Sequence, residues 1–140
     1  MASRRLYLAL QLAGHRVRAV ADRQAKEQLG VTAAQLGMMF VIRRLPGCTQ
    51  RDVAQQLQLR ESGVTAAVAK LAGLGLVQRE RRDGRTMALS LTEAGESCVA
   101  DARPLVLELE ERLREGFTEE ELDVVSRFLD ATIDRFAEGT

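Results

Sequence analysis

The chain has 140 residues, of which 46% are hydrophobic, and it carries 20 basic and 20 acidic side chains. This length and apolar content indicate one globular domain and exclude a disordered chain. No stretch reaches the 18 apolar residues of a membrane span, so we expect no membrane partner. The zero net charge is unevenly distributed: residues 31–92 carry nine basic and four acidic side chains, whereas residues 93–140 carry five and fourteen. We expect the acidic segment to form solvated helix faces and the basic segment to face an anionic partner.

Residues 3 to about 28 are predicted to form one long helix that Gly30 ends. Its apolar stripe has helical spacing and comprises Leu6, Leu10, Ala13, Val17 and Val20. Leu8 and Leu12 widen the stripe, so the helix should be buried on more than one side and pack against another subunit. Arg4 and Arg5 before this apolar run weakly resemble a secretion signal, but no cleavage site follows, and we expect a cytoplasmic protein.

Two short helices are expected to follow, each with a clear start. Thr32 and Gln35 form a capping box for a helix that runs to about Leu45, with Val31 packing onto Leu36. Pro46-Gly47 stops that helix. Thr49 then caps a shorter one.

A second helix of a helix-turn-helix is predicted over residues 62–74, after a turn at residues 59–62. Val64, Val68 and Leu71 share its buried face. The sequence Asp83-Gly84 between two extended runs predicts a hairpin. Arg79, Arg81, Arg82 and Arg85 surround its turn, a pattern that favours an anionic partner.

Two helices should close the chain. Thr92 caps the first, Pro104 should bend it, and Gly116 ends it. Phe117, Thr118 and Glu121 mark the start of the last helix with a staple and a capping box. Its apolar residues are Leu122, Val125, Leu129, Ile133 and Phe136.

Three motifs in this order resemble the MarR (multiple antibiotic resistance regulator) family of winged-helix regulators. They are G-L-V-x-R at residues 75–79, D-x-R at residues 83–85 and L-x-L-T-x-x-G at residues 89–95. The resemblance implies a mainly α fold with a small β-hairpin wing in a single domain over residues 1–140. Residues 31–92 would be the winged helix-turn-helix DNA-binding lobe, and residues 1–30 and 93–140 the helical dimerisation region.

The resemblance also implies a homodimer that binds a pseudo-palindromic operator in double-stranded DNA, acts as a repressor and is released by a small phenolic or lipophilic effector or by thiol oxidation. The expected DNA-binding residues are Gln50, Arg51, Arg60, Ser62, Gly63, Thr65, Ala66, Lys70, Arg79, Arg81, Arg82, Asp83 and Arg85. Arg85 would enter the minor groove from the wing. Many members have an arginine after the recognition-helix threonine, where this chain has Ala66, so we expect less direct guanine readout.

The effector would lodge near His15, Met38, Met39 and Arg43 by the same resemblance, although core packing is an alternative role for the methionines. Cys48 and Cys98 can be oxidant sensors or simple packing residues, and we favour packing. One histidine and two distant cysteines do not supply a metal site, so we expect no metal or cofactor. No nucleophile with a base and an orienting group is recognisable, so we expect no catalytic residues and no enzyme.

Two alternatives remain open. A winged-helix module can serve only protein contacts, with the acidic C-terminal third as its docking face, but such a module does not need four arginines around one turn. The second alternative is a helical protein that binds small molecules and does not bind DNA. Salt-dependent binding to duplex DNA separates both from a DNA-binding regulator.

Overall fold

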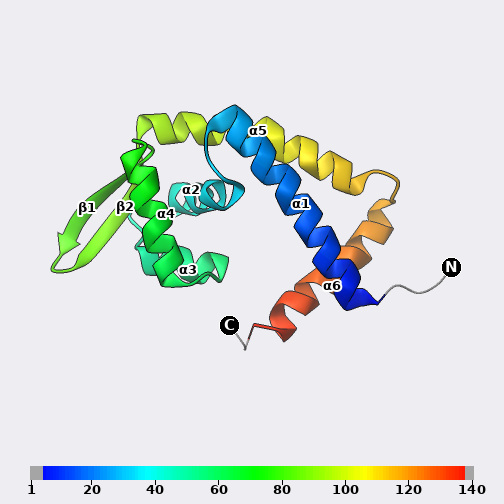
Figure 1. The fold of residues 1–140 in the computed structure, drawn as a ribbon. Coiled ribbons are helices and arrows are strands. Elements are labelled where there is room, and N and C mark those ends of the chain that lie inside the picture. Colours follow the sequence, from blue (N-terminus) through cyan, green and yellow to red (C-terminus); the bar gives the residue numbers. More distant parts are fainter. Residues whose placement is uncertain (1–4, 138–140) are drawn as a thin grey trace. The chain divides into compact units, whose positions relative to one another are not determined.

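The computed structural model describes residues 5–137 of the chain, so the predicted helix positions 3 and 4, and the two ends of the predicted domain, lie outside the described residues. Six helices and one two-stranded antiparallel sheet make up the described part (Figure 1). Their bounds are α1 Leu6–Leu29, α2 Ala33–Arg44, α3 Gln50–Leu57, α4 Glu61–Gly73, β1 Val77–Asp83, β2 Thr86–Leu91, α5 Glu93–Arg114 and α6 Glu119–Arg135. This order confirms the mainly α fold with a hairpin wing.

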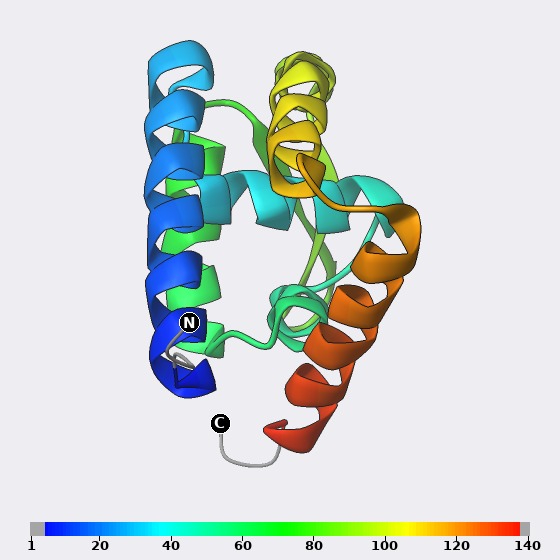
Figure 2. The same ribbon diagram turned by 90° about the vertical axis from the view of Figure 1, so that its right-hand side faces the viewer.

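The chain divides into two compact units, residues 1–105 and 106–140. The first unit contains α1 to α4, the hairpin and the first half of α5. In it α2 runs crosswise to α1 and packs against α3, α4 and β2 (Figure 2). Helix α5 continues through Pro104, and the division falls one residue later, after Leu105.

Local sequence signals set the helix starts. Thr32 with Gln35, Thr49 with Asp52 and Thr118 with Glu121 each form a capping box in which side chain and backbone bond reciprocally. These boxes satisfy backbone N–H groups that a helix start leaves unpaired. Asp22 adds a contact from another helix, because its Oδ1 accepts a hydrogen bond of 2.8 Å from the Ala33 N–H. The predicted starts at Thr32, Thr49 and Thr118 are therefore confirmed.

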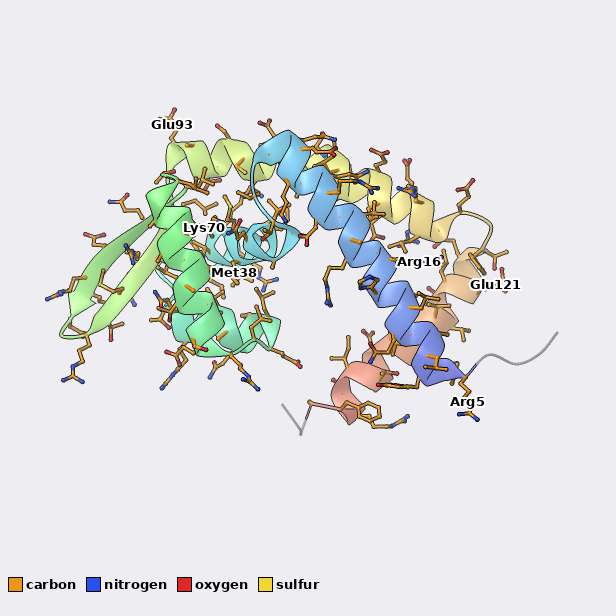
Figure 3. The ribbon with its side chains drawn as sticks, viewed as in Figure 1. Arg5, Arg16, Met38, Lys70, Glu93 and Glu121 are labelled. Carbon is orange, nitrogen blue, oxygen red and sulfur yellow. The ribbon has the colours of Figure 1, made fainter. Side chains whose placement is uncertain are left out.

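The core of the first unit lies between α2, α3, α4, the hairpin and the start of α5. Its largest fully buried side chains are Met39, Ile42, Leu71, Leu89, Val31, Val53, Val64 and Val68. Burial of Val64, Val68 and Leu71 confirms the predicted inner face of α4. Met38, labelled on α2 in Figure 3, belongs to the same buried cluster as these residues of α4.

Helix α1 leaves most of its apolar side chains uncovered within the single chain. Within one chain Ala25 is the one buried residue of α1, and Leu6 and Leu8 are 69% and 57% exposed, so the predicted packing of α1 against another subunit stays a prediction. These leucines are exposed because the apolar N-terminal half of α1 extends beyond the segment that packs on α2. Helix α6 likewise has no buried residue: Val125, Leu129 and Ile133 are exposed, and Phe136 lies just after the helix.

Candidate nucleic-acid interface

Helices α3 and α4 form the predicted helix-turn-helix. The turn between them is tight, because Gln58 adopts a left-handed conformation with φ +52° and the Leu59 N–H donates to the Ala54 carbonyl oxygen at 2.9 Å. Arg60 is the N-cap of α4 but makes no side-chain cap. The first turn of α4 is therefore open to solvent at the end that a recognition helix presents to base edges.

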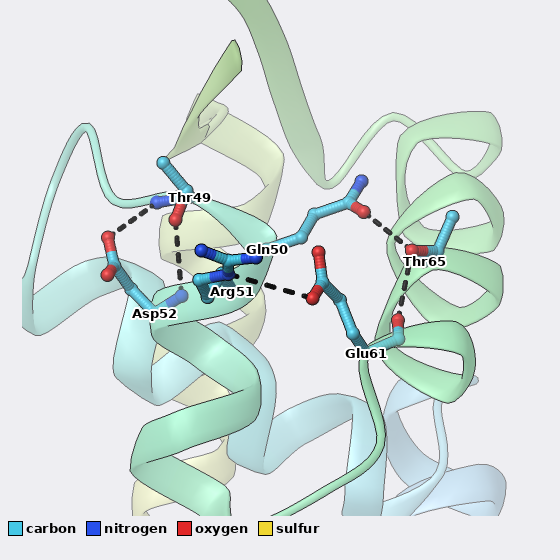
Figure 4. A network of polar contacts seen from close by, with 6 residues as sticks. All are labelled: Thr49, Gln50, Arg51, Asp52, Glu61 and Thr65. Atoms are coloured by element: carbon cyan, nitrogen blue, oxygen red, sulfur yellow. Dashed lines mark hydrogen bonds and ion pairs between the residues drawn. The ribbon is translucent and has the colours of Figure 1, made fainter. Parts of the chain in front are cut away.

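A polar network joins the start of α3 to the first turn of α4 (Figure 4). Thr65 Oγ1 lies 2.7 Å from Gln50 Oε1 and 2.9 Å from the Glu61 carbonyl oxygen. Arg51 Nε lies 3.8 Å from Glu61 Oε2, an exposed ion pair. These contacts hold Gln50 and Arg51 beside the recognition helix, where both were predicted to contact DNA.

Asp52 belongs to the same helix start and caps it. Its carboxylate accepts a hydrogen bond of 2.9 Å from the Thr49 N–H. That backbone hydrogen bond, assisted by the Thr49 hydroxyl and by the charge of Arg82, lowers the pKa of the Asp52 carboxyl below its ordinary value. Asp52 is therefore ionised at neutral pH and serves the helix cap.

The wing is a hairpin in which Val77 pairs with Leu91 and Asp83 with Thr86. Gly84 and Arg85 form its two-residue turn, and Gly84 has φ +50°, a conformation that glycine adopts without strain. The pairing is irregular between Arg81 and Asp83, which adds twist to the tip. The structure thus confirms the hairpin that Asp83-Gly84 predicted.

The wing is tied to the loop between α2 and α3 by contacts from its middle and from the residues just before its tip. Arg82 Nη2 donates a hydrogen bond of 2.9 Å to the Gly47 carbonyl oxygen. The Gly47 N–H donates to the Leu89 carbonyl oxygen at 2.8 Å, and the Leu89 N–H donates to the Cys48 carbonyl oxygen at 2.8 Å. The structure therefore uses Arg82, predicted as a DNA contact, to fix the wing. The sequence did not indicate this role for Gly47, since Pro46-Gly47 signals only a helix end.

A second junction joins α4, the wing and α5. The Thr92 hydroxyl donates to the Gly75 carbonyl oxygen at 2.6 Å and accepts from the Gly95 N–H at 3.0 Å. The Thr92 N–H donates to the Leu76 carbonyl oxygen at 3.1 Å. Gly95 is buried against that same carbonyl. These contacts explain why G-L-V and L-T-x-x-G occur together, since each motif supplies half of one junction.

A cleft of about 710 Å³ opens between the start of α3 and the wing tip. It is lined by Thr49, Gln50, Arg51, Glu61, Arg85, Thr86 and Met87. Three residues predicted to bind DNA from separate segments, Gln50, Arg51 and Arg85, therefore converge. A smaller cleft of about 400 Å³ lies beside the anchored part of the wing and includes Arg81 and Arg82.

The remaining predicted DNA-binding residues all lie on the surface of the first unit. Arg60, Ser62, Gly63, Ala66 and Lys70 are exposed on α4 or at its cap, and Arg79, Arg81 and Asp83 are exposed on β1. Lys70 projects from α4 in Figure 3. The acidic residue Glu61, at the start of α4, lies among them.

The predicted effector residues do not come together in either of these two clefts. Met38 and Met39 are buried in the core, with exposed fractions of 4% and 0%. His15 is exposed on α1. Arg43 is exposed on α2 and forms an ion pair with Glu96 at 3.4 Å. The methionines thus have the packing role that was left open as an alternative, and an effector site at these residues stays a prediction.

Both cysteines are buried and unpaired with each other. Burial raises the pKa of the Cys48 thiol and of the Cys98 thiol, with the charges of Asp52 and Asp101 adding to the effect. Such thiols carry little thiolate and react slowly. Within residues 5–137 no group of three metal-ligating side chains gathers, and no helix is long and apolar enough to cross a bilayer.

Comparisons with known proteins agree with this geometry. A sequence model described as the MarR family matches residues 29–86, which include the helix-turn-helix and most of the wing. The HTH-type transcriptional regulator BilQ of Clostridium symbiosum is 31% identical over 94 residues. That alignment covers 66% of this chain, and the chain spans 65% of the length of BilQ. It spans 52% of an HTH-type transcriptional regulator of Bacillus cereus that is 28% identical over 78 residues.

A solved structure shows the same fold over nearly the whole chain. The S. aureus MepR–DNA complex superposes with a TM-score of 0.89 at 22% sequence identity, covering 96% of this chain and all of that one. Helix-turn-helix, wing and flanking helices therefore occur in the same order in both. The sequence match over residues 29–86, the three motifs and the winged-helix geometry together support a MarR family winged-helix regulator.

Proposed function

We propose that the protein is a homodimeric, cytoplasmic DNA-binding regulator that represses transcription from a pseudo-palindromic operator. The observation that carries the proposal is the convergence of Arg51 and Arg85 in one cleft beside the exposed first turn of α4. A recognition helix in the major groove places the cleft against the sugar-phosphate backbone and the wing tip near the minor groove. The net charge of +5 on residues 31–92 favours the same anionic partner.

The proposed dimer rests on apolar side chains that lie exposed on two helices. On α1 they are Leu6, Tyr7, Leu8, Leu10 and Leu12, and on and just after α6 they are Val124, Val125, Phe128, Leu129, Ile133 and Phe136. Monomeric proteins rarely leave apolar surface of this extent in contact with water, whereas subunit interfaces bury it. Both helices are therefore proposed as dimerisation elements.

Analytical ultracentrifugation tests the dimer directly. We expect a dimer for the full chain, and loss of the dimer when residues 122–140 are deleted, because the deletion removes most of the apolar face of α6. We expect the deletion to impair folding as well, so a well-folded monomer from it would contradict the proposed interface. A monomeric full chain at micromolar concentration would refute the proposal.

Operator symmetry follows from the dimer. Two related recognition helices should select two related half-sites about 10 bp apart, one turn of the duplex. Selection of duplexes from a random pool by the purified protein measures this spacing. Enrichment of sites with no dyad symmetry would contradict the proposed operator.

The decisive test of DNA binding is the salt dependence of affinity for Arg85→Ala. Each neutralised phosphate contributes about −0.9 to the slope of log affinity against log salt concentration. Replacing Arg85 in both subunits should therefore make the slope shallower by about 2 and weaken binding on most duplexes. Arg23→Ala is the matched control, since it removes one exposed charge on α1, away from the cleft.

The two arginine variants also separate this proposal from a module that binds only proteins. If Arg85→Ala and Arg23→Ala have equal affinities and equal salt slopes on every duplex, the wing is not a DNA element. Release by a small phenolic or lipophilic effector is part of the proposal through the resemblance to the MarR family. It is tested by titrating a panel of phenols into the protein–operator complex, and dissociation at constant ionic strength is the expected result.

A further inference from the structure

The hydroxyl of Thr65 has one hydrogen, which it donates in a hydrogen bond within the protein. The two polar atoms near Thr65 Oγ1, Gln50 Oε1 at 2.7 Å and the Glu61 carbonyl oxygen at 2.9 Å, are both acceptors. A hydroxyl can donate to one of them at a time, and in either case its hydrogen points into the protein. What Thr65 presents to an incoming ligand is therefore lone pairs.

This conclusion does not depend on the orientation of the Gln50 amide. The oxygen and nitrogen of an amide can be exchanged by a rotation of 180°. In the exchanged orientation Gln50 donates to Thr65 Oγ1, and the Thr65 hydroxyl donates to the Glu61 carbonyl oxygen. One lone pair of Thr65 then still faces outward, and no hydrogen does.

Glu61 lies one helical turn before Thr65 on the same side of α4. Its side chain is 56% exposed, and its carboxylate pairs loosely with Arg51 at 3.8 Å. An ionised carboxylate accepts hydrogen bonds and donates none. Ser62, which can donate, is turned by about 100° around the helix axis. We call the edge formed by Glu61 and Thr65 the acceptor edge.

The floor of the major groove offers few donors to such an edge. Cytosine presents its N4 amine and adenine its N6 amine, whereas guanine presents two acceptors at N7 and O6, and thymine an acceptor at O4 with a methyl group. We propose that the acceptor edge selects an exocyclic amine on the strand it contacts, with cytosine preferred through Glu61, and rejects guanine at that position. The proposal rests on the proposed DNA binding.

Arg51 allows the carboxylate to approach DNA. A free carboxylate near the phosphates would be repelled, but the Arg51 guanidinium beside Glu61 balances its charge. Arg51 lies at the start of α3, the helix that crosses the sugar-phosphate backbone in this motif. Its two remaining guanidinium nitrogens can therefore bind a phosphate while Nε stays next to Glu61. The pair would fix the carboxylate over one base step.

The experiment measures base preference at each half-site position for three proteins. Competition binding uses the selected operator and duplexes with every single base substitution. For the wild type we expect one position per half-site at which cytosine or adenine binds about tenfold or more tightly than guanine. Glu61→Gln supplies an amide that can donate to guanine, so the penalty for guanine should fall severalfold.

Thr65→Val tests the other half of the edge, since valine keeps the shape and removes the lone pairs. It should weaken the amine-bearing operator severalfold and leave the salt slope unchanged. Glu93→Gln is the matched control: it also removes one exposed carboxylate, at the start of α5, and should leave the base preference as in the wild type.

The outcomes separate this inference from the proposed function. If the wild type binds duplex DNA but prefers guanine at the contacted positions, or if Glu61→Gln and Thr65→Val leave every base preference unchanged, the acceptor edge is refuted and DNA binding stands. If the wild type fails to bind any duplex at low salt, the proposed function is refuted and this inference falls with it.

Discussion

Replacing Gly95 by alanine should destabilise the fold although Gly95 lies in a helix. A Cβ built on Gly95 would sit well inside van der Waals contact with the Leu76 carbonyl oxygen, 3.1 Å from the Leu76 carbonyl carbon and 3.3 Å from Leu91 Cβ. That carbonyl cannot easily move, because it accepts the hydrogen bond of the Thr92 N–H. Either α5 shifts away from the wing or the junction between α4, the wing and α5 opens.

Two opposing contributions determine how much Gly95→Ala changes the free energy of unfolding. Alanine is favoured over glycine in a helix interior by about 1 kcal/mol. Forcing extra atoms into a packed site costs about 1–3 kcal/mol, and a clash with a fixed backbone carbonyl belongs at or above the upper end of that range. The free energy of unfolding should therefore fall by about 2 kcal/mol, which corresponds to roughly 4–8 °C in Tm for a protein of this size.

Thermal unfolding at one fixed protein concentration measures the effect, since the stability of an oligomer depends on concentration. Gly37→Ala is the matched control: Gly37 lies within α2, and an added Cβ there meets no atom within 4 Å. It should be neutral or stabilise by up to about 1 kcal/mol. If Gly95→Ala melts at or above the temperature of Gly37→Ala, the close approach of α5 to Leu76 is wrong.

Three further predictions concern the turn, the wing and the cysteines. Gln58→Gly should stabilise the protein by about 0.5 kcal/mol in urea unfolding, because glycine relieves the left-handed strain but loses more entropy on folding; lower stability would contradict this. Arg82→Gln should speed amide hydrogen exchange in the wing, whereas Arg81→Gln should not; equal rates would refute the anchoring role of Arg82. A Cys48→Ser, Cys98→Ser variant should keep effector-responsive DNA binding, and peroxide that releases only the wild type from DNA would show an oxidation switch.

Helix starts and the hairpin could be predicted because their signals are local. A threonine and a residue three positions later decide each capping box, and Asp83-Gly84 indicates the hairpin, whose two-residue turn is Gly84 and Arg85. The inner face of α4 was equally predictable, since Val64, Val68 and Leu71 repeat with the helical period. In each of these cases the residues that interact are close in sequence.

Which surface covers α1 could not be predicted by the same reasoning. The apolar stripe shows that a helix has a face that avoids water, but not which surface covers it. In this chain α2 packs against the C-terminal half of α1, and Leu6 and Leu8 stay exposed. The spacing of these leucines therefore indicates that an interface exists, but it does not identify the surface that covers them.

The role of Thr65 shows why base readout is harder to predict than fold. By sequence, Thr65 is a residue near the start of a recognition helix with a hydroxyl that can donate or accept. In the structure, the Thr65 hydroxyl donates its hydrogen either to Gln50, which lies 15 positions earlier in the chain, or to the carbonyl oxygen of Glu61. The groups that remain for DNA are thus set by tertiary contacts. Substitution of Gln50 in a relative could change the readout of Thr65 without altering the recognition helix itself.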